Sequence, residues 1–288
     1  MDLAAVIFVE TAYAIASLIL VSMGLAVVFG MMRVINLAHG EFMMMGGYTT
    51  IVAVKAGINI YIAILIIAPF VVGIIGLVVE RLVIRHLYGR LVDTMLATWG
   101  LSLFFVGIVT MIFGNTTTGI STPISGFQIG DYQINGYNFF IIVLVILLLI
   151  VMYALLKGTR LGLIARGTMQ RSDIAAALGY DPERIYMLTF MAGSALSGLA
   201  GAVLAPLVGL VPTSGGAYIA KSFITVVAGG PSIITGLISS AASFGFINQV
   251  FTFGISPVVG EVALLVAAVI LLRLMPQGIT GRFFKGKL

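Results

Sequence analysis

The sequence predicts an all-α protein, a polytopic transmembrane helical bundle with about eight membrane segments, some of them broken or re-entrant. The composition is the first reason: 60% of the 288 residues are hydrophobic and only 9% are charged, whereas roughly a quarter of the residues in a soluble domain carry charge. The second reason is that polar residues gather in a few connections between long apolar runs, which leaves room for about eight spans of ~20 residues. We therefore expect a single transmembrane domain over residues 1–288, with no soluble domain beside it.

Charge and cysteine content exclude several other classes of protein. The net charge is +5, but the basic residues cluster beside the ends of apolar runs, which is a signal of membrane topology rather than of nucleic-acid binding. The chain has no cysteine, so disulfides and thiolate metal sites are excluded. The N-terminal segment carries Glu10 and lacks a basic region, so we do not expect a cleaved signal peptide.

Four apolar runs in the first half of the chain are long enough to cross a bilayer. They cover residues 11–32, 58–79, 94–113 and 137–156. A shorter run that ends near Lys55 is marginal as a span. Arg33 and the basic residues between 81 and 90 predict cytoplasmic connections, so we expect the N-terminus outside. The Gly-, Thr- and Ser-rich segment 114–136 is typical of an external loop.

The second half of the chain contains an interrupted apolar stretch. Residues 186–208 are rich in small side chains, which allow helices in lipid to pack closely. The last span, about 258–274, is followed by basic residues and should end in the cytoplasm. Residues 218–250 must then enter and leave the membrane on the same side, as a helix hairpin or re-entrant pair that breaks at Gly229 and Gly230. Broken helices in transporters often mark the substrate path. The basic residues after the last span are Arg273, Arg282, Lys285 and Lys287.

Residues 32–48 hold polar groups where the sequence returns to the membrane. Ionisable side chains at membrane depth are costly unless they are paired or face water, which makes them candidates for function. If this stretch is helical, Asn36, His39 and Gly40 share one face, and Glu41 follows directly. The alternative is that these are ordinary polar residues at a helix end near the interface. A metal site is the weaker hypothesis, because one histidine and one glutamate do not make a ligand set.

Residues 157–186 form the longest polar run. A helix is expected over Thr168–Leu178, ended by Gly179 in the left-handed conformation. Asp181 and Pro182 then predict the N-cap and first position of the next helix. The segment is either a solvated loop or a short helix onto which a cytoplasmic protein docks. Its five basic residues place it in the cytoplasm: Lys157, Arg160, Arg166, Arg171 and Arg184.

Three motifs resemble one known family. Gly-Leu-Ala at 24–26 and Met-Arg-Val-Ile-Asn-Leu-Ala-His-Gly-Glu-Phe-Met at 32–43 are similar to the signature of LivH-type permease subunits of branched-chain amino acid ABC importers. The 157–186 segment resembles the coupling loop of ABC importer permeases, and residues 275–282 resemble the family's closing motif, with Met275 where a basic residue is more usual. The resemblance covers residues 24–48, 160–204 and 223–282.

The resemblance implies a permease subunit in the bacterial or archaeal cytoplasmic (inner) membrane that translocates branched-chain or other hydrophobic amino acids. It implies a second homologous permease subunit, two ATP-binding cassette subunits, an extracytoplasmic substrate-binding protein and membrane lipid as partners, with no nucleic acid, no cofactor and no catalysis by the chain itself. The path candidates are Asn36, His39, Gly40, Glu41, Gly229 and Gly230. The residues expected to couple to the ATPase are Arg166, Gln170, Asp173, Ile174, Ala177 and Gly179.

Other functions remain open at this point. Close relatives in this family carry urea or short amides. An ion-coupled secondary transporter would need carboxylates in mid-membrane, for which Glu41 and Glu261 are the candidates. An intramembrane enzyme would have only His39 with Glu41 as a catalytic pair. Residues 281–287 match the spacing of a phosphate-binding loop up to its lysine, but Leu288 stands where Ser or Thr would bind magnesium, so we do not expect nucleotide binding there.

Overall fold

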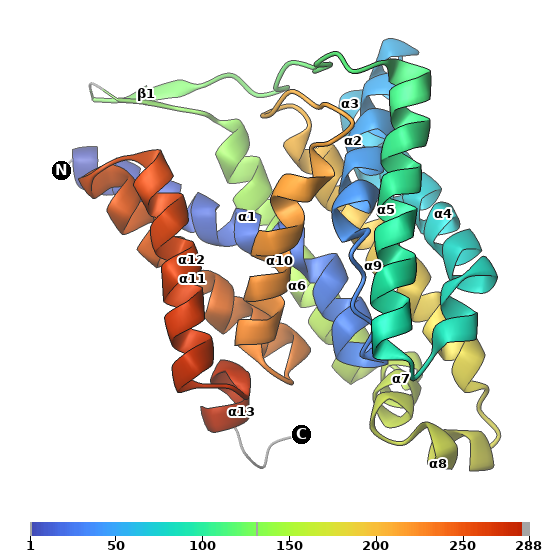
Figure 1. Cartoon of the computed structure of the whole chain (residues 1–288). Helices are drawn as coiled ribbons and strands as arrows, with labels where there is room; N and C mark the ends of the chain where they lie inside the picture. The colour runs from blue at the N-terminus through green and yellow to red at the C-terminus, as the bar shows by residue number, and fades with distance from the viewer. Residues whose placement is uncertain (1, 131, 284–288) are drawn as a thin grey trace. The chain divides into compact units, whose positions relative to one another are not determined.

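A computed structural model describes residues 2–130 and 132–283. Figure 1 shows a chain made almost entirely of helices, and seven of those described are long and apolar enough to cross a membrane. The predicted all-α polytopic fold is therefore confirmed. Lys285 and Lys287, and the end of the sequence that resembles a phosphate-binding loop, lie outside the described residues.

The longest connections between the elements are residues 114–126 and 205–214. The first half contains α1 (Asp2–Met32), α2 (His39–Lys55), α3 (Ile60–Ile62), the π-helical η1 (Ala63–Ile67), α4 (Ala68–Leu82), the 3-10 helix η2 (Ile84–Leu87), α5 (Leu91–Phe113), β1 (Phe127–Ile129) and β2 (Tyr132–Ile134). The second half contains α6 (Tyr137–Gly158), α7 (Arg160–Gln170), α8 (Ser172–Ala177), α9 (Pro182–Leu204), α10 (Gly215–Gly229), α11 (Ile233–Gly254), α12 (Pro257–Leu274) and α13 (Gly278–Phe283). Together α3, η1 and α4 make one span, and β1 pairs with β2 in an antiparallel hairpin.

The chain divides into two compact units. The first comprises Met1–Ser22, Thr122–Met152 and Lys221–Leu288, and the second comprises Met23–Ser121 and Tyr153–Ala220. Three helices, α1, α6 and α10, contribute residues to both units.

In the second unit, α2 and α4 both pack against α9. The contacts depend on glycine, because a Cβ at Gly46 would collide with the backbone of Gly198, and one at Gly201 would collide with the backbone of Met43. Helices can approach this closely only where side chains are absent. The close packing predicted for the small residues of α9 is confirmed.

In the first unit, α11 and α12 lie side by side (Figure 1). The predicted break is present, since α10 ends at Gly229 and α11 begins at Ile233. Gly230 adopts a φ of +86°, which glycine allows without strain. The short helix α13 stabilises this break, because the Thr280 hydroxyl donates a hydrogen bond to the Gly229 carbonyl over 2.6 Å. That residues 218–250 enter and leave the membrane on one side stays a prediction.

The helix expected over Thr168–Leu178 is not continuous, which corrects the prediction. The chain leaves the helical conformation at Arg171, with φ −147° and ψ 89° between α7 and α8. The Arg171 guanidinium donates two hydrogen bonds to the Asp173 carboxylate, over 3.1 and 2.8 Å. Residues two apart do not face each other on a helix, so this pair is compatible with a break and not with a continuous helix.

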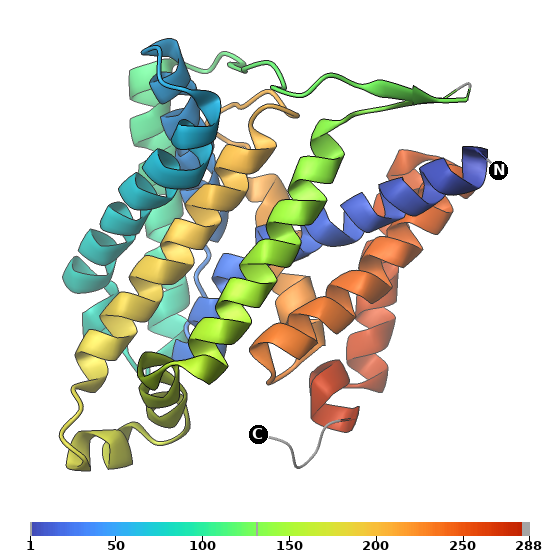
Figure 2. The same cartoon turned by 180° about the vertical axis from the view of Figure 1, so that it is seen from behind.

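The predicted helix end at Gly179 and the predicted helix start at Asp181 and Pro182 are both confirmed. Gly179 has a φ of +87°, the left-handed conformation that ends a helix. The Asp181 side chain accepts hydrogen bonds from the backbone N–H groups of Glu183 and Arg184, and Pro182 takes the first position of α9. Figure 2 shows α7 and α8 at the end of α9 where that helix begins.

Candidate functional site

Side-chain hydrogen bonds stabilise the connection between α1 and α2, residues 33–38. We call this connection the joint. The Asn36 side-chain oxygen accepts a hydrogen bond from the Ala38 N–H over 3.0 Å, and the Leu37 N–H donates to the Thr98 hydroxyl on α5, also over 3.0 Å. Asn36 precedes the start of α2 at His39, so the expectation that Asn36 shares a helical face with His39 and Gly40 is wrong. The physical reason is that the asparagine closes a turn with its own side chain, an alternative to helix that this residue type favours.

His39 ties the start of α2 to α9. Its side chain is buried, and Nδ1 lies 3.0 Å from the Ser197 hydroxyl oxygen. That hydroxyl donates its single proton to the Gly193 carbonyl over 2.8 Å, so the bond is satisfied when His39 Nδ1 carries the hydrogen and donates it to Ser197. Gly40 packs its backbone directly against Gly215 at the start of α10.

Glu41 differs from its neighbours because its carboxylate is not fully satisfied. The residue is only 5% exposed, and Ser102 of α5 faces its side chain. Among the residues that the structure describes, no group hydrogen-bonds its second oxygen, Oε2. A buried carboxylate oxygen without a partner is costly, so Glu41 is the member of this motif with the strongest claim to a functional role.

The two sets of path candidates belong to different units. Asn36, His39, Gly40 and Glu41 lie in the second unit, whereas Gly229 and Gly230 lie in the first. The structure gives the last two a clear local role, because a Cβ at Gly229 would collide with Gly236 and one at Gly230 would crowd Gln277 and Thr280. Their placement in a substrate path remains a prediction.

The apolar stripe on α8 faces away from the described helices of this chain. Ile174 is 48% exposed and Leu178 is 73% exposed, and Ala177 between them is also exposed. Ala175, on another side of the helix, is buried. We call Ile174, Ala177 and Leu178 the α8 stripe. It is free to contact another protein, and it does not anchor α8 to its own chain.

A small pocket lies beside the break between α7 and α8. Its volume is about 220 Å³. The Arg171 guanidinium that borders it lowers the pKa of Asp173 to about 2 through their hydrogen bonds, so Asp173 is negatively charged at physiological pH. The pocket lies between the C-terminal end of α1 and the predicted coupling residues Gln170 and Asp173. Its lining comprises Met31, Met32, Arg33, Thr168, Met169, Gln170, Arg171, Ser172, Asp173 and Tyr186.

The remaining coupling candidates have different surroundings. The Arg166 side chain donates to the Gly162 carbonyl of its own helix over 3.3 Å. Gly179 supplies the turn between α8 and α9 described above. The structure thus places Asp173, Ile174 and Ala177 on α8 and Gly179 just after it, while Gln170 and Asp173 line the pocket beside the break.

Sequence reasoning missed a polar cluster at the connection between α4 and α5, the second of the predicted cytoplasmic connections. Arg85 of η2 forms an ion pair with Glu183 at the start of α9, and the Tyr88 hydroxyl donates to the buried Glu80 carboxylate. Burial raises the pKa of Tyr88, with a further contribution from Glu80. No local signal marks the pair of Arg85 with Glu183, since the two residues are 98 positions apart. The pair of Arg85 with Glu183 joins the connection between α4 and α5 to the start of α9.

The family model described as "Branched-chain amino acid transport system / permease component" matches residues 7–275. The probable branched-chain amino acid transport permease protein LivH of Methanocaldococcus jannaschii is 27% identical, covering 92% of this chain and 88% of its own length. LivH of Escherichia coli K12, named as a high-affinity branched-chain amino acid transport system permease protein, is 25% identical over 91% of both chains. BraD of Pseudomonas aeruginosa, named in the same way, is 29% identical over 91% of both chains. No solved structure matches significantly.

Proposed function

The chain belongs to the family of branched-chain amino acid transport system permease components, and from this premise we propose that it is the membrane-spanning permease subunit of an ABC importer. The observation that carries the proposal is the extent of the family match, from residue 7 to residue 275. The proposed substrates are branched-chain or other hydrophobic amino acids. The relatives named above are branched-chain amino acid permeases, which supports this choice over urea or short amides.

The proposed assembly contains a second homologous permease subunit, two ATP-binding cassette subunits and an extracytoplasmic binding protein. ATP hydrolysis belongs to the cassette subunits, and this chain acts as one transmembrane permease domain. In this scheme the binding protein delivers the amino acid to the outer face. ATP binding then changes the access of the path from one side of the membrane to the other.

We assign the docking of the ATPase to α8, within a coupling segment that extends over residues 157–186. The α8 stripe supports this assignment, because exposed Ile174 and Leu178 side chains outside the membrane gain by burial against a partner. The break at Arg171 separates α8 from α7, so that α8 can change its angle without unwinding a longer helix. The pocket beside the break would transmit that movement to the end of α1 through Arg33 and Asp173.

Within the membrane we assign the path contribution of residues 36–41 mainly to Glu41. Asn36 and His39 have hydrogen-bond partners that hold the joint between α1 and α2, so their proposed role is to position Glu41. The proposed orientation has the N-terminus outside and the C-terminus in the cytoplasm, from the basic clusters at 81–90, 157–184 and 273–287.

Co-purification tests the docking assignment with a matched pair of variants. Ala177→Glu places a charge in the α8 stripe, where a docked partner would bury it unpaired at a cost of about 3–5 kcal/mol, equivalent to a loss in affinity of roughly a hundredfold or more. Ala176→Glu adds the same charge at an exposed position on the opposite side of α8. We expect the first variant to reach the membrane without its ATPase and the second to retain it. Equal retention of the ATPase by both variants would show that α8 is not part of the docking surface.

A further inference from the structure

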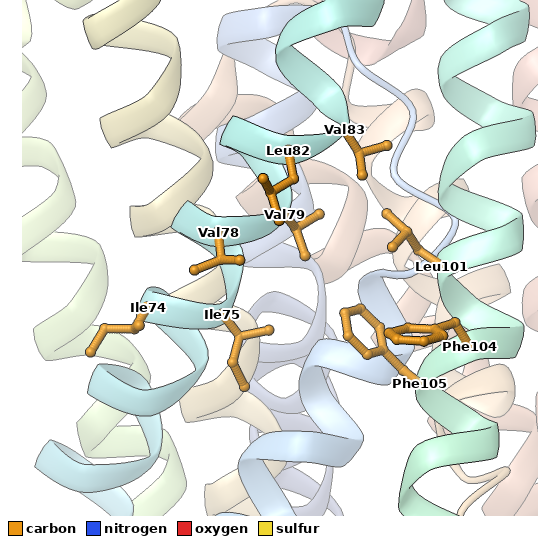
Figure 3. A pocket seen from close by; sticks show the side chains of 9 residues that line it. All are labelled: Ile74, Ile75, Val78, Val79, Leu82, Val83, Leu101, Phe104 and Phe105. Carbon is orange, nitrogen blue, oxygen red and sulfur yellow. The ribbon is translucent and has the colours of Figure 1, made fainter.

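An apolar groove runs between α4 and α5 in the second unit. Its volume is about 360 Å³, within the range of about 300–1,000 Å³ that is usual for ligand pockets. Figure 3 shows side chains of α4 on one side and of α5 on the other. All nine side chains that line it are hydrocarbon: Ile74, Ile75, Val78, Val79, Leu82, Val83, Leu101, Phe104 and Phe105.

The groove is open on the outside of the unit and closed by the core beneath. Val79 and Phe105 form its floor and are each 7% exposed, as members of the hydrophobic core of this unit. Val78 and Phe104 form its walls and are 46% and 58% exposed. Because α4 and α5 both belong to candidate membrane spans, the exposed walls lie where hydrocarbon and not water surrounds the protein.

One end of the groove carries an unpaired cation. Ile74, Val78 and Arg81 lie at i, i+4 and i+7, so they follow one another along one stripe of α4. Arg81 is exposed. The neighbouring Arg85 and Arg90 are paired with Glu183 and Asp93, whereas no ion pair involves Arg81 within residues 2–130 and 132–283.

We propose that this groove binds an acyl chain of an anionic glycerophospholipid whose phosphate contacts Arg81. The hydrocarbon lining excludes a polar ligand, and the cation at one end matches a lipid in which a negatively charged headgroup adjoins an apolar chain. From Ile74 to Arg81 the helix rises by ~10 Å, a depth that an acyl chain covers from the headgroup region. The basic residues around Arg81 place this end at the cytoplasmic surface, where anionic lipids attract arginine.

Native mass spectrometry of the protein, released from nanodiscs that contain phosphatidylglycerol and phosphatidylethanolamine, tests the groove. Wild-type protein should retain phosphatidylglycerol preferentially. Val78→Trp fills the groove and should abolish this retention, while Val143→Trp, at a 64% exposed position of α6, should leave it unchanged. Unchanged elution on size exclusion shows that each variant is folded. Retention of the lipid by a folded Val78→Trp variant would overturn the proposal.

The charge is tested separately. Arg81→Gln should reduce the preference for phosphatidylglycerol over phosphatidylethanolamine by roughly fivefold, the effect of one basic residue near the membrane surface. Lys55→Gln removes an exposed cation from the far end of α2 and should have no such effect. An unchanged preference in Arg81→Gln would refute the role of Arg81. Disulfide formation between Val78→Cys of one copy and Phe104→Cys of another would show that a second permease subunit, and not lipid, covers the groove.

Discussion

Replacement of Thr98 by valine tests whether the joint between α1 and α2 is held by hydrogen bonds. The Thr98 hydroxyl is fully buried and accepts the Leu37 N–H over 3.0 Å. Valine has nearly the same volume, so the substitution leaves no cavity but removes the acceptor. A fully buried N–H without a partner costs about 1–3 kcal/mol, and the part-buried Leu37 N–H should cost about 1–2 kcal/mol, which changes the folded-to-unfolded ratio by a factor of about 5–30.

Thr110→Val is the matched control, because it makes the same chemical change on the same helix. The Thr110 hydroxyl donates only to the Val106 carbonyl of its own helix, so its loss leaves no N–H group without an acceptor. The assay is denaturant unfolding of both variants in detergent micelles, followed by tryptophan fluorescence from Trp99 on α5. We expect Thr98→Val to unfold at a clearly lower denaturant concentration than wild type, and Thr110→Val to unfold close to it. Coincident unfolding of the two variants would refute the reasoning.

Three further predictions concern the path, the broken helix and the topology. Glu41→Gln should insert normally, keep its ATPase and slow amino acid uptake. Asn36→Leu should lower both the stability of the protein and its uptake. Normal uptake by either variant would show that the replaced residue is an ordinary polar group at the membrane interface. Thr280→Val removes the hydrogen bond to the Gly229 carbonyl at the break between α10 and α11, at a cost of about 1–3 kcal/mol. The variant should show faster hydrogen–deuterium exchange at that break. Unchanged exchange would show that this hydrogen bond does not stabilise the break. Single cysteines at Ser125 and Ser172, both exposed in a chain without native cysteine, should react with an impermeant thiol reagent from opposite sides of the membrane; labelling of both from one side would contradict the proposed orientation.

The features that the sequence predicted correctly depend on local physical chemistry. Gly179 ends a helix because glycine adopts positive φ without strain, and Asp181 with Pro182 begins one because a carboxylate and a fixed φ suit the first turn. The break at Gly229 and Gly230 follows from the same kind of local signal. Apolar runs of sufficient length predict membrane helices because a helix satisfies its backbone hydrogen bonds within a single segment, as lipid requires.

The features that the sequence did not predict depend on side chains that compete with a helix or on distant contacts. Arg171 and Asp173 pair across a break, and the separate propensities of the two residues do not reveal this. Asn36 closes a turn in place of joining α2. The pair between Arg85 and Glu183, and the approach of Arg33 to the coupling segment, bring together residues far apart in the chain, and only the fold supplies that information.

Transport by the purified assembly in proteoliposomes tests the central claim most directly. The permease would be reconstituted with its ATP-binding cassette subunits and its binding protein, and uptake of radiolabelled leucine would be measured with ATP inside the vesicles. We expect uptake that needs ATP and the binding protein, persists when an uncoupler abolishes ion gradients, and is lost in Ala177→Glu but not in Ala176→Glu. Uptake that collapses with the uncoupler and proceeds without ATP would contradict the account and indicate an ion-coupled secondary transporter.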